Sequence, residues 1–402
     1  MVNSVLIFTA PGQGAQTPGF LSPWLEIPGL AERFGAWSEL AGRDLIGLGT
    51  TGSAEEITDT SVAQPLLVAA ALAVAGLLGE PDAAAGHSVG ELAAGAIAGV
   101  LSASDAIRLT RVRGEAMAAS CGDTPTGMTV VLGGDQATVL DAIAGAGLTP
   151  ANINGAGQIV AGGTLEQLAA FAAHPPAGAR LRSLRVAGAF HTRHMAPAVG
   201  ILEAAADGTS IKDPVITLLS IADGAVVTSG PDWVDRIVNQ VASPVRWDLC
   251  MAAMPGLGVT AMIELLPGGT LTGIAKRALP GVALLAIKTP DQLDAARALI
   301  AAHSASANGH GAAAVVSAAE PDIVMAPRAG TVRLGTGITG ATATPAGATI
   351  RAGDLLGRII AGGGEKAVTA PYDAMITEWL VRDGDPVGEG QPLVRLEPKE
   401  QP

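Results

Sequence analysis

Apolar stretches of two lengths alternate in the N-terminal part of the chain. Residues 5–9 form a short apolar run, typical of a buried strand, that ends in the turn Pro11-Gly12-Gln13-Gly14. Residues 65–78 are apolar over the length of a helix, and residues 83–85 form a second short run before a small-residue segment at 91–98. Because strand, tight turn and helix follow one another, the pattern predicts an α/β fold over residues 1–300.

Residues 128–187 carry a pattern of their own inside this unit. Their strand and helix signals follow in the order β-α-β-β-α-β, which is typical of a ferredoxin-like subdomain and predicts one inserted at about residues 125–190. The predicted elements are a strand at 128–132, a helix at 135–144, a hairpin of strands at 151–154 and 158–161, a helix at 165–173 and a strand at 181–186.

The composition changes after residue 300. Residues 302–319 are rich in Ala, Ser and Gly and contain no charged side chain, so we expect a linker at 301–319, with a poorly periodic helix as the alternative. From 320 to 402, Gly and Pro punctuate short Val, Ile and Leu runs, and the motif at 353–357 is echoed at 384–388. This imperfect repeat predicts a small all-β barrel-sandwich domain with internal pseudo-symmetry.

Composition narrows the functional classes. The net charge is −13, which disfavours a nucleic-acid partner. Two cysteines, Cys121 and Cys250, cannot build a disulfide framework or a CxxC zinc site. The N-terminal apolar run is too short for a signal peptide, and the longest later run, 66–78, is shorter than the ~20 residues that span a membrane, so we expect a cytoplasmic protein.

A candidate nucleophile lies in Gly86-His87-Ser88-Val89-Gly90, which fits the pattern G-x-S-x-G. A serine on a sharp strand-to-helix turn needs small neighbours, and the helix that follows directs free amides toward a bound substrate. The amide of Val89 is then a candidate oxyanion donor. The alternative is a turn without chemistry.

Four of the six histidines are poor candidates for the base that Ser88 needs. His303 and His310 fall in the predicted linker, where we expect them to be exposed to solvent. His174 precedes a Pro-Pro turn, and His87 adjoins the serine with a side chain expected to point away from it.

His191 is therefore the candidate base, and His194 is either its partner or a bystander. A metal pair of His191 and His194 lacks an accompanying Glu or Cys, so we expect no metal. The loop Gly12-Gln13-Gly14-Ala15-Gln16 has Thr17 where a dinucleotide loop has its third glycine, and no nucleotide cofactor is expected. The amide of Gln13 fits better as a second oxyanion donor.

Together these residues resemble the malonyl-CoA:acyl carrier protein transacylase family and the related acyltransferase domains of polyketide synthases. The resemblance covers about residues 4–300 and implies an α/β-hydrolase-like larger subdomain. It rests on the motifs above and on Gln64-Pro65, Arg111-Val112-Arg113-Gly114, Asn152-Ile153-Asn154, Gly188-Ala189-Phe190-His191, Gln240, Pro244-Val245 and Thr270-Leu271-Thr272-Gly273.

The resemblance implies a ping-pong reaction with malonyl-CoA and an acyl carrier protein as partners. Ser88 attacks the thioester while His191 takes its proton, and the backbone carbonyl of Gln240 orients the histidine. The malonyl-serine ester is then attacked by the phosphopantetheine thiol of the carrier protein.

The resemblance also implies how the substrate is bound. Arg113 grips the malonyl carboxylate, Gln64 belongs to the substrate-binding set, and Phe190 crowds an α-methyl group, so that malonyl is partly favoured over methylmalonyl. The enzyme alternative is a serine hydrolase of acyl thioesters. It is disfavoured by the mid-chain position of His191 and by the presence of Arg113, which a hydrolase does not need.

Basic residues suggest where a carrier protein docks, because carrier proteins are acidic. The stretch 180–193 contains four arginines and no acid, and a further basic pair follows later. The alternative is an ordinary solvated edge strand. The candidate docking residues are Arg180, Arg182, Arg185, Arg193, Lys276 and Arg277.

Residues 322–397 resemble biotinyl/lipoyl carrier domains, through the Ala-Pro-x-x-Gly-x-Val pattern and the pattern from Gly384 to Leu393. The attachment lysine of those domains would fall at position 363, which is Gly, and Lys366 is out of register. The resemblance therefore implies a carrier fold without its modified lysine, used for docking or assembly or else a passive appendage. A scaffold whose C-terminal domain mediates docking is the non-enzyme alternative.

Overall fold

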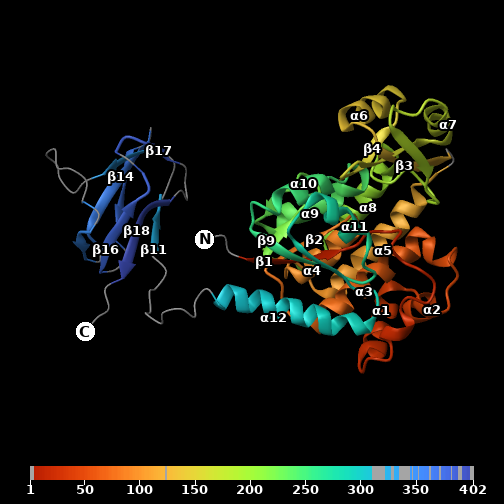
Figure 1. Cartoon of the computed structure of the whole chain (residues 1–402), viewed down its shortest axis with the longest axis horizontal. Coiled ribbons are helices and arrows are strands. Elements are labelled where there is room, and N and C mark those ends of the chain that lie inside the picture. Colours follow the sequence, from red (N-terminus) through yellow and green to blue (C-terminus); the bar gives the residue numbers. More distant parts are fainter. Residues whose placement is uncertain are drawn as a thin grey trace. The chain divides into compact units, whose positions relative to one another are not determined.

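The computed structural model describes residues 4–122 and 125–309 and, further on, 322–326, 330–334, 345, 347–351, 353–361, 364–370, 373–381, 383–387 and 392–398. It divides into two compact units, Met1–His310 and Gly311–Pro402 (Figure 1). The division falls inside the predicted linker.

The centre of the first unit is a six-stranded sheet with β1 and β2 side by side. Its strands are parallel except for the last pair, which is antiparallel. Because Ala10 is in register with Gly86, the turns that leave β1 and β2 lie next to each other at one edge of the sheet. The strand order is β10 (Ala283–Ala286), β9 (Val259–Glu264), β1 (Val5–Ala10), β2 (Ala83–Gly86), β7 (Thr217–Leu219) and β8 (Val226–Val227).

Helix α3 (Thr60–Leu78) is the apolar helix that the sequence predicts, and it begins five residues earlier than the apolar run. The Asp59 side chain accepts a hydrogen bond from the Ser61 amide and caps the helix. By length and composition alone α3 could cross a membrane, but all but two of its residues are buried within this unit. Small residues let it pack closely against α5 (Ala103–Ala119): a Cβ on Gly114 would lie 2.9 Å from the Thr60 carbonyl oxygen.

The remaining helices pack against strands of this unit or against other helices. They are α1 (Leu30–Ala41), α2 (Leu45–Thr50), α4 (Gly90–Ile97), α8 (Ala196–Ala206), α9 (Gly230–Asn239), α10 (Trp247–Ala253), α11 (Thr270–Ala278) and α12 (Leu293–Gly309).

A four-stranded antiparallel sheet with two helices forms the second subdomain, at one end of the unit (Figure 1, yellow). The predicted β-α-β-β-α-β order of elements is confirmed, and the sheet order is β4-β5-β3-β6. The last strand ends at Ser183 instead of residue 186, and residues 184–186 beyond it line a cavity. The elements are β3 (Thr126–Gly133), α6 (Gln136–Gly145), β4 (Thr149–Gly155), β5 (Gln158–Thr164), α7 (Leu165–Ala173) and β6 (Ala179–Ser183).

Helix α12 extends into the predicted linker, so that prediction is wrong for residues 301–309. His303 lies in this helix with only 9% of its surface exposed, contrary to the expectation that it is solvated. Its Nε2 lies 3.0 Å from Asp82 Oδ2, and its Nδ1 lies 3.1 Å from Ser4 Oγ. These hydrogen bonds replace water around the His303 ring. The uncharged Ala/Ser-rich segment can therefore pack as a helix against the sheet. His310 lies outside the described residues.

The described elements of the second unit are all strands, as predicted. Its described strands form two four-stranded antiparallel sheets, and the side chains of both contribute to one apolar core that includes Val332, Ile359, Ile376 and Leu396. One sheet has the order β11 (Asp322–Met325), β18 (Pro392–Pro398), β16 (Ala374–Trp379), β13 (Thr349–Ile350); the other has β15 (Gly364–Thr369), β14 (Leu355–Ala361), β12 (Gly330–Leu334), β17 (Pro386–Val387).

The repeated motif of this unit has a structural basis in two glycines. Gly353 and Gly384 both adopt positive φ, 87° and 93°, a conformation that favours glycine. Each donates its amide hydrogen to a carbonyl of a neighbouring segment, Ala370 at 2.8 Å and Val332 at 2.9 Å. The two halves therefore enter their sheets through the same kind of turn.

Candidate active site

Ser88 lies on the turn between β2 and α4, and its backbone is left-handed with φ of 53°. That conformation is costly for a residue other than glycine and must be imposed by the surroundings. The two motif glycines show how: a Cβ on Gly86 would lie 2.1 Å from the Gly90 carbonyl carbon, and one on Gly90 would lie 2.2 Å from the Ala10 carbonyl oxygen. Only glycines allow the turn to pack this tightly against β1 and α4.

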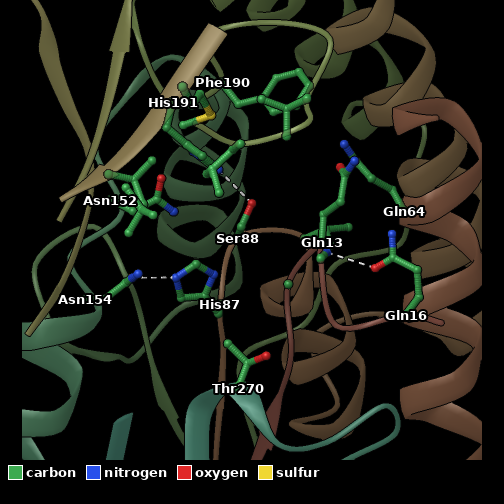
Figure 2. Close-up of a pocket in the computed structure, with 18 of the residues that line it drawn as sticks. Gln13, Gln16, Gln64, His87, Ser88, Asn152, Asn154, Phe190, His191 and Thr270 are labelled. Carbon is green, nitrogen blue, oxygen red and sulfur yellow. Dashed lines mark hydrogen bonds between the residues drawn. The ribbon is translucent and has the colours of Figure 1, made fainter. Parts of the chain in front are cut away.

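His191 faces Ser88 from the loop that follows β6 (Figure 2). Its Nε2 lies 2.7 Å from Ser88 Oγ, and its Nδ1 lies 2.9 Å from the carbonyl oxygen of Gln240. Because a carbonyl can only accept, Nδ1 carries the proton and Nε2 is free to accept from the serine hydroxyl. Burial, together with the positive charge of Arg113, lowers the pKa of His191 to about 3, so the ring is neutral near pH 7.

Arg113 reaches the same place from α5, with only 1% of its surface exposed. Its Nη1 donates to Gln64 Oε1 at 2.6 Å, and its Nη2 donates to Gln240 Oε1 at 2.6 Å and to Ser88 Oγ at 3.4 Å. Nε is buried and has no hydrogen-bond partner in the described part of the chain. Burial lowers the pKa of Arg113 to about 9, which still leaves it charged at neutral pH.

A buried guanidinium beside a nucleophile can bind the anionic end of a substrate. No carboxylate forms an ion pair with Arg113 within the described residues, so its charge is balanced only by amide oxygens and by the more distant Glu91. A carboxylate fits the forked donor geometry of arginine.

The two predicted oxyanion donors, Gln13 and Val89, line the same cavity as Ser88. The turn that carries Gln13 packs against the serine turn, since a Cβ on Gly12 would lie 2.8 Å from the carbonyl oxygen of His87. Within the described residues, neither the Gln13 amide nor the Val89 amide has an acceptor. The Gln13 side chain is bonded elsewhere, to the Thr58 carbonyl at 3.0 Å. The backbone amides are thus available to an oxyanion.

These groups line a cavity of about 450 Å³ between the two subdomains. Phe190 and Val130 of the smaller subdomain contribute to its wall, and Thr270 contributes from the N-terminus of α11 (Figure 2). Asn154 also lines the cavity, and its Oδ1 accepts from His87 Nε2 at 2.8 Å. His87 has no hydrogen bond to Ser88 among the described residues, and burial lowers its pKa.

The structure brings together Ser88, His191, Arg113, Gln64 and Gln240, which are far apart in the sequence. His194 does not join them: its amide is bonded to Thr192 within a short 3-10 turn. Among the described residues no three His, Cys, Asp or Glu side chains are grouped to hold a metal ion.

The sequence did not reveal Glu91 or the side chain of Gln240 as parts of the site. Glu91 is buried three residues after Ser88, and Gln240 Nε2 donates to its carboxylate. An acid in the first turn of a helix is common, so the position of Glu91 in the sequence does not indicate its burial. Its burial depends on Gln240, which is distant in the sequence, so no local signal could have found it.

All six candidate docking residues are exposed. Arg185 also lines the catalytic cavity, and Arg182 and Arg185 line a neighbouring cavity along β3 and β6. The basic side chains on this side of the smaller subdomain thus lie next to the entrance of the site.

The acyl transferase domain family matches residues 38–304 of this chain. The chain is 53% identical over 297 residues to the malonyl CoA-acyl carrier protein transacylase of Mycobacterium tuberculosis (strain H37Rv), which covers 72% of this chain and 98% of that protein. The transacylase of Escherichia coli (strain K12) is 33% identical over 301 residues, with 72% and 97% covered.

Solved structures give the same picture. The crystal structure of MCAT from Mycobacterium tuberculosis has a TM-score of 0.71 and 52% sequence identity, with 73% of this chain and 99% of that chain covered. A malonyl-transacylase in complex with its type II PKS acyl-carrier protein has a TM-score of 0.69 and 29% identity, with 74% and 100% covered.

Proposed function

The chain belongs to the acyl transferase family, with the malonyl CoA-acyl carrier protein transacylases, and we propose that Ser88 is the residue on which it carries the malonyl group. Its reaction is the transfer of malonyl from malonyl-CoA to an acyl carrier protein. The observation that supports the role of Ser88 is its 2.7 Å contact with His191 beside the buried guanidinium of Arg113.

In the first half-reaction, Ser88 Oγ attacks the thioester carbon as its proton moves to His191 Nε2. The negative charge on the carbonyl oxygen is held by the amides of Gln13 and Val89. When the C–S bond breaks, His191 returns the proton to the departing CoA sulfur, leaving malonyl esterified to Ser88.

The second half-reaction reverses these steps with a different thiol. His191 takes the proton of the phosphopantetheine thiol, whose sulfur attacks the ester carbon. Breaking the C–O bond returns the proton to Ser88 Oγ and frees the malonyl-carrier thioester. Both halves use one set of residues, which is the basis of a ping-pong mechanism.

Arg113 and Phe190 account for substrate choice in this proposal. The guanidinium binds the free malonyl carboxylate. Gln64 helps by holding the guanidinium at Nη1, while Gln240 holds it at Nη2. Phe190 narrows the cavity where an α-methyl group would lie, and one such contact is worth about 1–3 kcal/mol of discrimination.

Trapping the intermediate tests this function. Labelled malonyl-CoA should label the peptide that contains Ser88, and the label should leave with added holo acyl carrier protein much faster than with water. S88A, with the same cavity, should take up no label. Rapid loss to water with no gain from the carrier protein would instead favour a thioester hydrolase.

The exposed basic residues near the cavity are the proposed docking surface for the acidic carrier protein. Arg182 and Arg185 are central to it, with Arg180 and Arg193 beside them and Lys276 and Arg277 at the end of α11. Complementary charge steers such a partner toward the entrance of the site. We also propose that the reaction takes place in the cytoplasm.

For the C-terminal unit we propose a biotinyl/lipoyl-type fold that lacks its attachment lysine and serves docking or assembly. Two sheets over one core and the two equivalent glycine turns support this fold. Residue 363, where the lysine would stand, lies outside the described residues. Lys366 is exposed within β15, paired with Ile359 of β14. A biotin adduct on Lys366, found by mass spectrometry after expression with a biotin ligase, would overturn this proposal.

A further inference from the structure

Glu91 is a buried acid that the transfer reaction described above does not use. It lies in the first turn of α4, and only 1% of its surface is exposed. Its Oε1 accepts from the Ile221 amide at 3.3 Å, and its Oε2 accepts from Gln240 Nε2 at 2.5 Å. The other end of the same side-chain amide, Gln240 Oε1, accepts from Arg113. Burial raises the pKa of Glu91 to about 7, so above this pH the amide stands between an anion and a cation.

The two charges fix which way the Gln240 amide faces. A carboxylate accepts and a guanidinium donates, so the amide must present its NH₂ to Glu91 and its oxygen to Arg113. Rotating the amide by half a turn would set donor against donor at Arg113 and acceptor against acceptor at Glu91. An ionised Glu91 thus adds its own penalty to those from Arg113 and from the Ser88 carbonyl, which accepts from Gln240 Nε2 at 3.2 Å.

The orientation of this amide matters because it sets one side of the guanidinium. Gln64 holds Nη1, Gln240 holds Nη2, and Nε has no partner in the described part of the chain. Without the Gln240 oxygen, the guanidinium would keep only Gln64 as a strong acceptor. Its plane could then turn about that single contact.

We propose that Glu91 is a positioning residue that fixes the Gln240 amide and thereby holds Arg113 where the free carboxylate of the malonyl group binds. The inference rests on the proposed function of Arg113. It assigns Glu91 to substrate selection, and leaves the proton transfer between Ser88 and His191 to the backbone carbonyl of Gln240.

The variant E91Q tests this role without changing the size of the side chain. Its single amide oxygen can accept from Ile221 or from Gln240 but not from both, so it no longer penalises the reversed Gln240 amide as the carboxylate does. We expect the KM for malonyl-CoA to rise roughly tenfold, the effect of losing a hydrogen bond to a charged group, with kcat changed less than twofold. The kcat/KM for acetyl-CoA, which has no free carboxylate, should stay the same.

A merely structural role gives a different result. If Glu91 only anchors the segment of Ile221, E91Q should leave both substrates unaffected or lower both equally, and either outcome overturns the proposal. The variant Q240M removes the amide and gives a second test. If Glu91 acts through that amide, adding E91Q to Q240M should change the ratio of kcat/KM for malonyl-CoA to that for acetyl-CoA by less than twofold. A tenfold further fall in E91Q/Q240M contradicts the proposal, and this comparison also holds if E91Q alone does not fold.

R113A separates failure of this inference from failure of the proposed function. If R113A loses its preference for malonyl-CoA while E91Q keeps it, only the role of Glu91 is wrong. If R113A keeps that preference, the proposed function of Arg113 fails and the inference fails with it.

Discussion

Replacing Arg113 by alanine removes the only buried cation that contacts Ser88 in the described structure, and the size of its effect can be worked out. Removing one partner of a buried charged pair costs about 3–5 kcal/mol. At 1.4 kcal/mol per factor of ten, kcat/KM for malonyl-CoA should fall by roughly 10²- to 4 × 10³-fold. The change also leaves Gln64 Oε1 and Gln240 Oε1 without their donor, but that loss is common to every substrate.

The assay that isolates the carboxylate contact is therefore the ratio of kcat/KM for malonyl-CoA to that for acetyl-CoA. The common losses cancel in the ratio, which should fall by at least about 10²-fold. R113K, which keeps a charge without the fork, should give an intermediate ratio. R108A, an exposed arginine of the same helix, is the matched control. An unchanged ratio in R113A would refute the reasoning.

Two further predictions concern the surface and the base. Reversing two charges in R182E/R185E should raise the KM for acyl carrier protein more than the KM for malonyl-CoA. The rise should be smaller in high salt, which screens exposed charges. The control R108E/R297E, with the same charge change at exposed helix positions, should leave the KM for acyl carrier protein unchanged. An equal rise for both substrates would count against docking. Because the pKa of His191 is lowered to about 3, the unfolded chain binds the proton first as pH falls below about 6.5, so stability is lost toward acid. At pH 5 the free energy of unfolding should be lower by roughly 2 kcal/mol. In urea unfolding, H191Q should lose less of this free energy between pH 7 and pH 5 than the wild type does. Equal losses in the two proteins would contradict the prediction.

The turn that carries Ser88 could be predicted from the sequence, because its backbone conformation requires particular residues. Gly86 and Gly90 are required by contacts with immediate neighbours in the fold, so the turn carries its own signature around Ser88. The β-α-β-β-α-β subdomain was likewise visible, because each of its elements keeps a clear period.

Features that depend on distant contacts could not be predicted. Glu91 is buried because Gln240 and Ile221 come to it from far along the chain. His303 was expected in a solvated linker, since nothing in an uncharged Ala/Ser-rich stretch announces the bonds to Asp82 and Ser4 that dock its helix. The end of β6 was misplaced for a related reason: the apolar residues after it serve the cavity wall, and apolar character alone does not tell a strand from a lining loop.

Ser88 and His191 both have a left-handed backbone, with φ of 53° and 58°. The two residues proposed to carry out the reaction therefore lower the stability of the fold. Each residue holds a conformation of the kind that costs of order 1–3 kcal/mol, and the rest of the fold supplies that energy. Glycine at either position would relieve this backbone strain and abolish the reaction. The inactive variant should therefore unfold at a higher temperature than the active enzyme. Selection for thermal stability alone would therefore replace these two residues first.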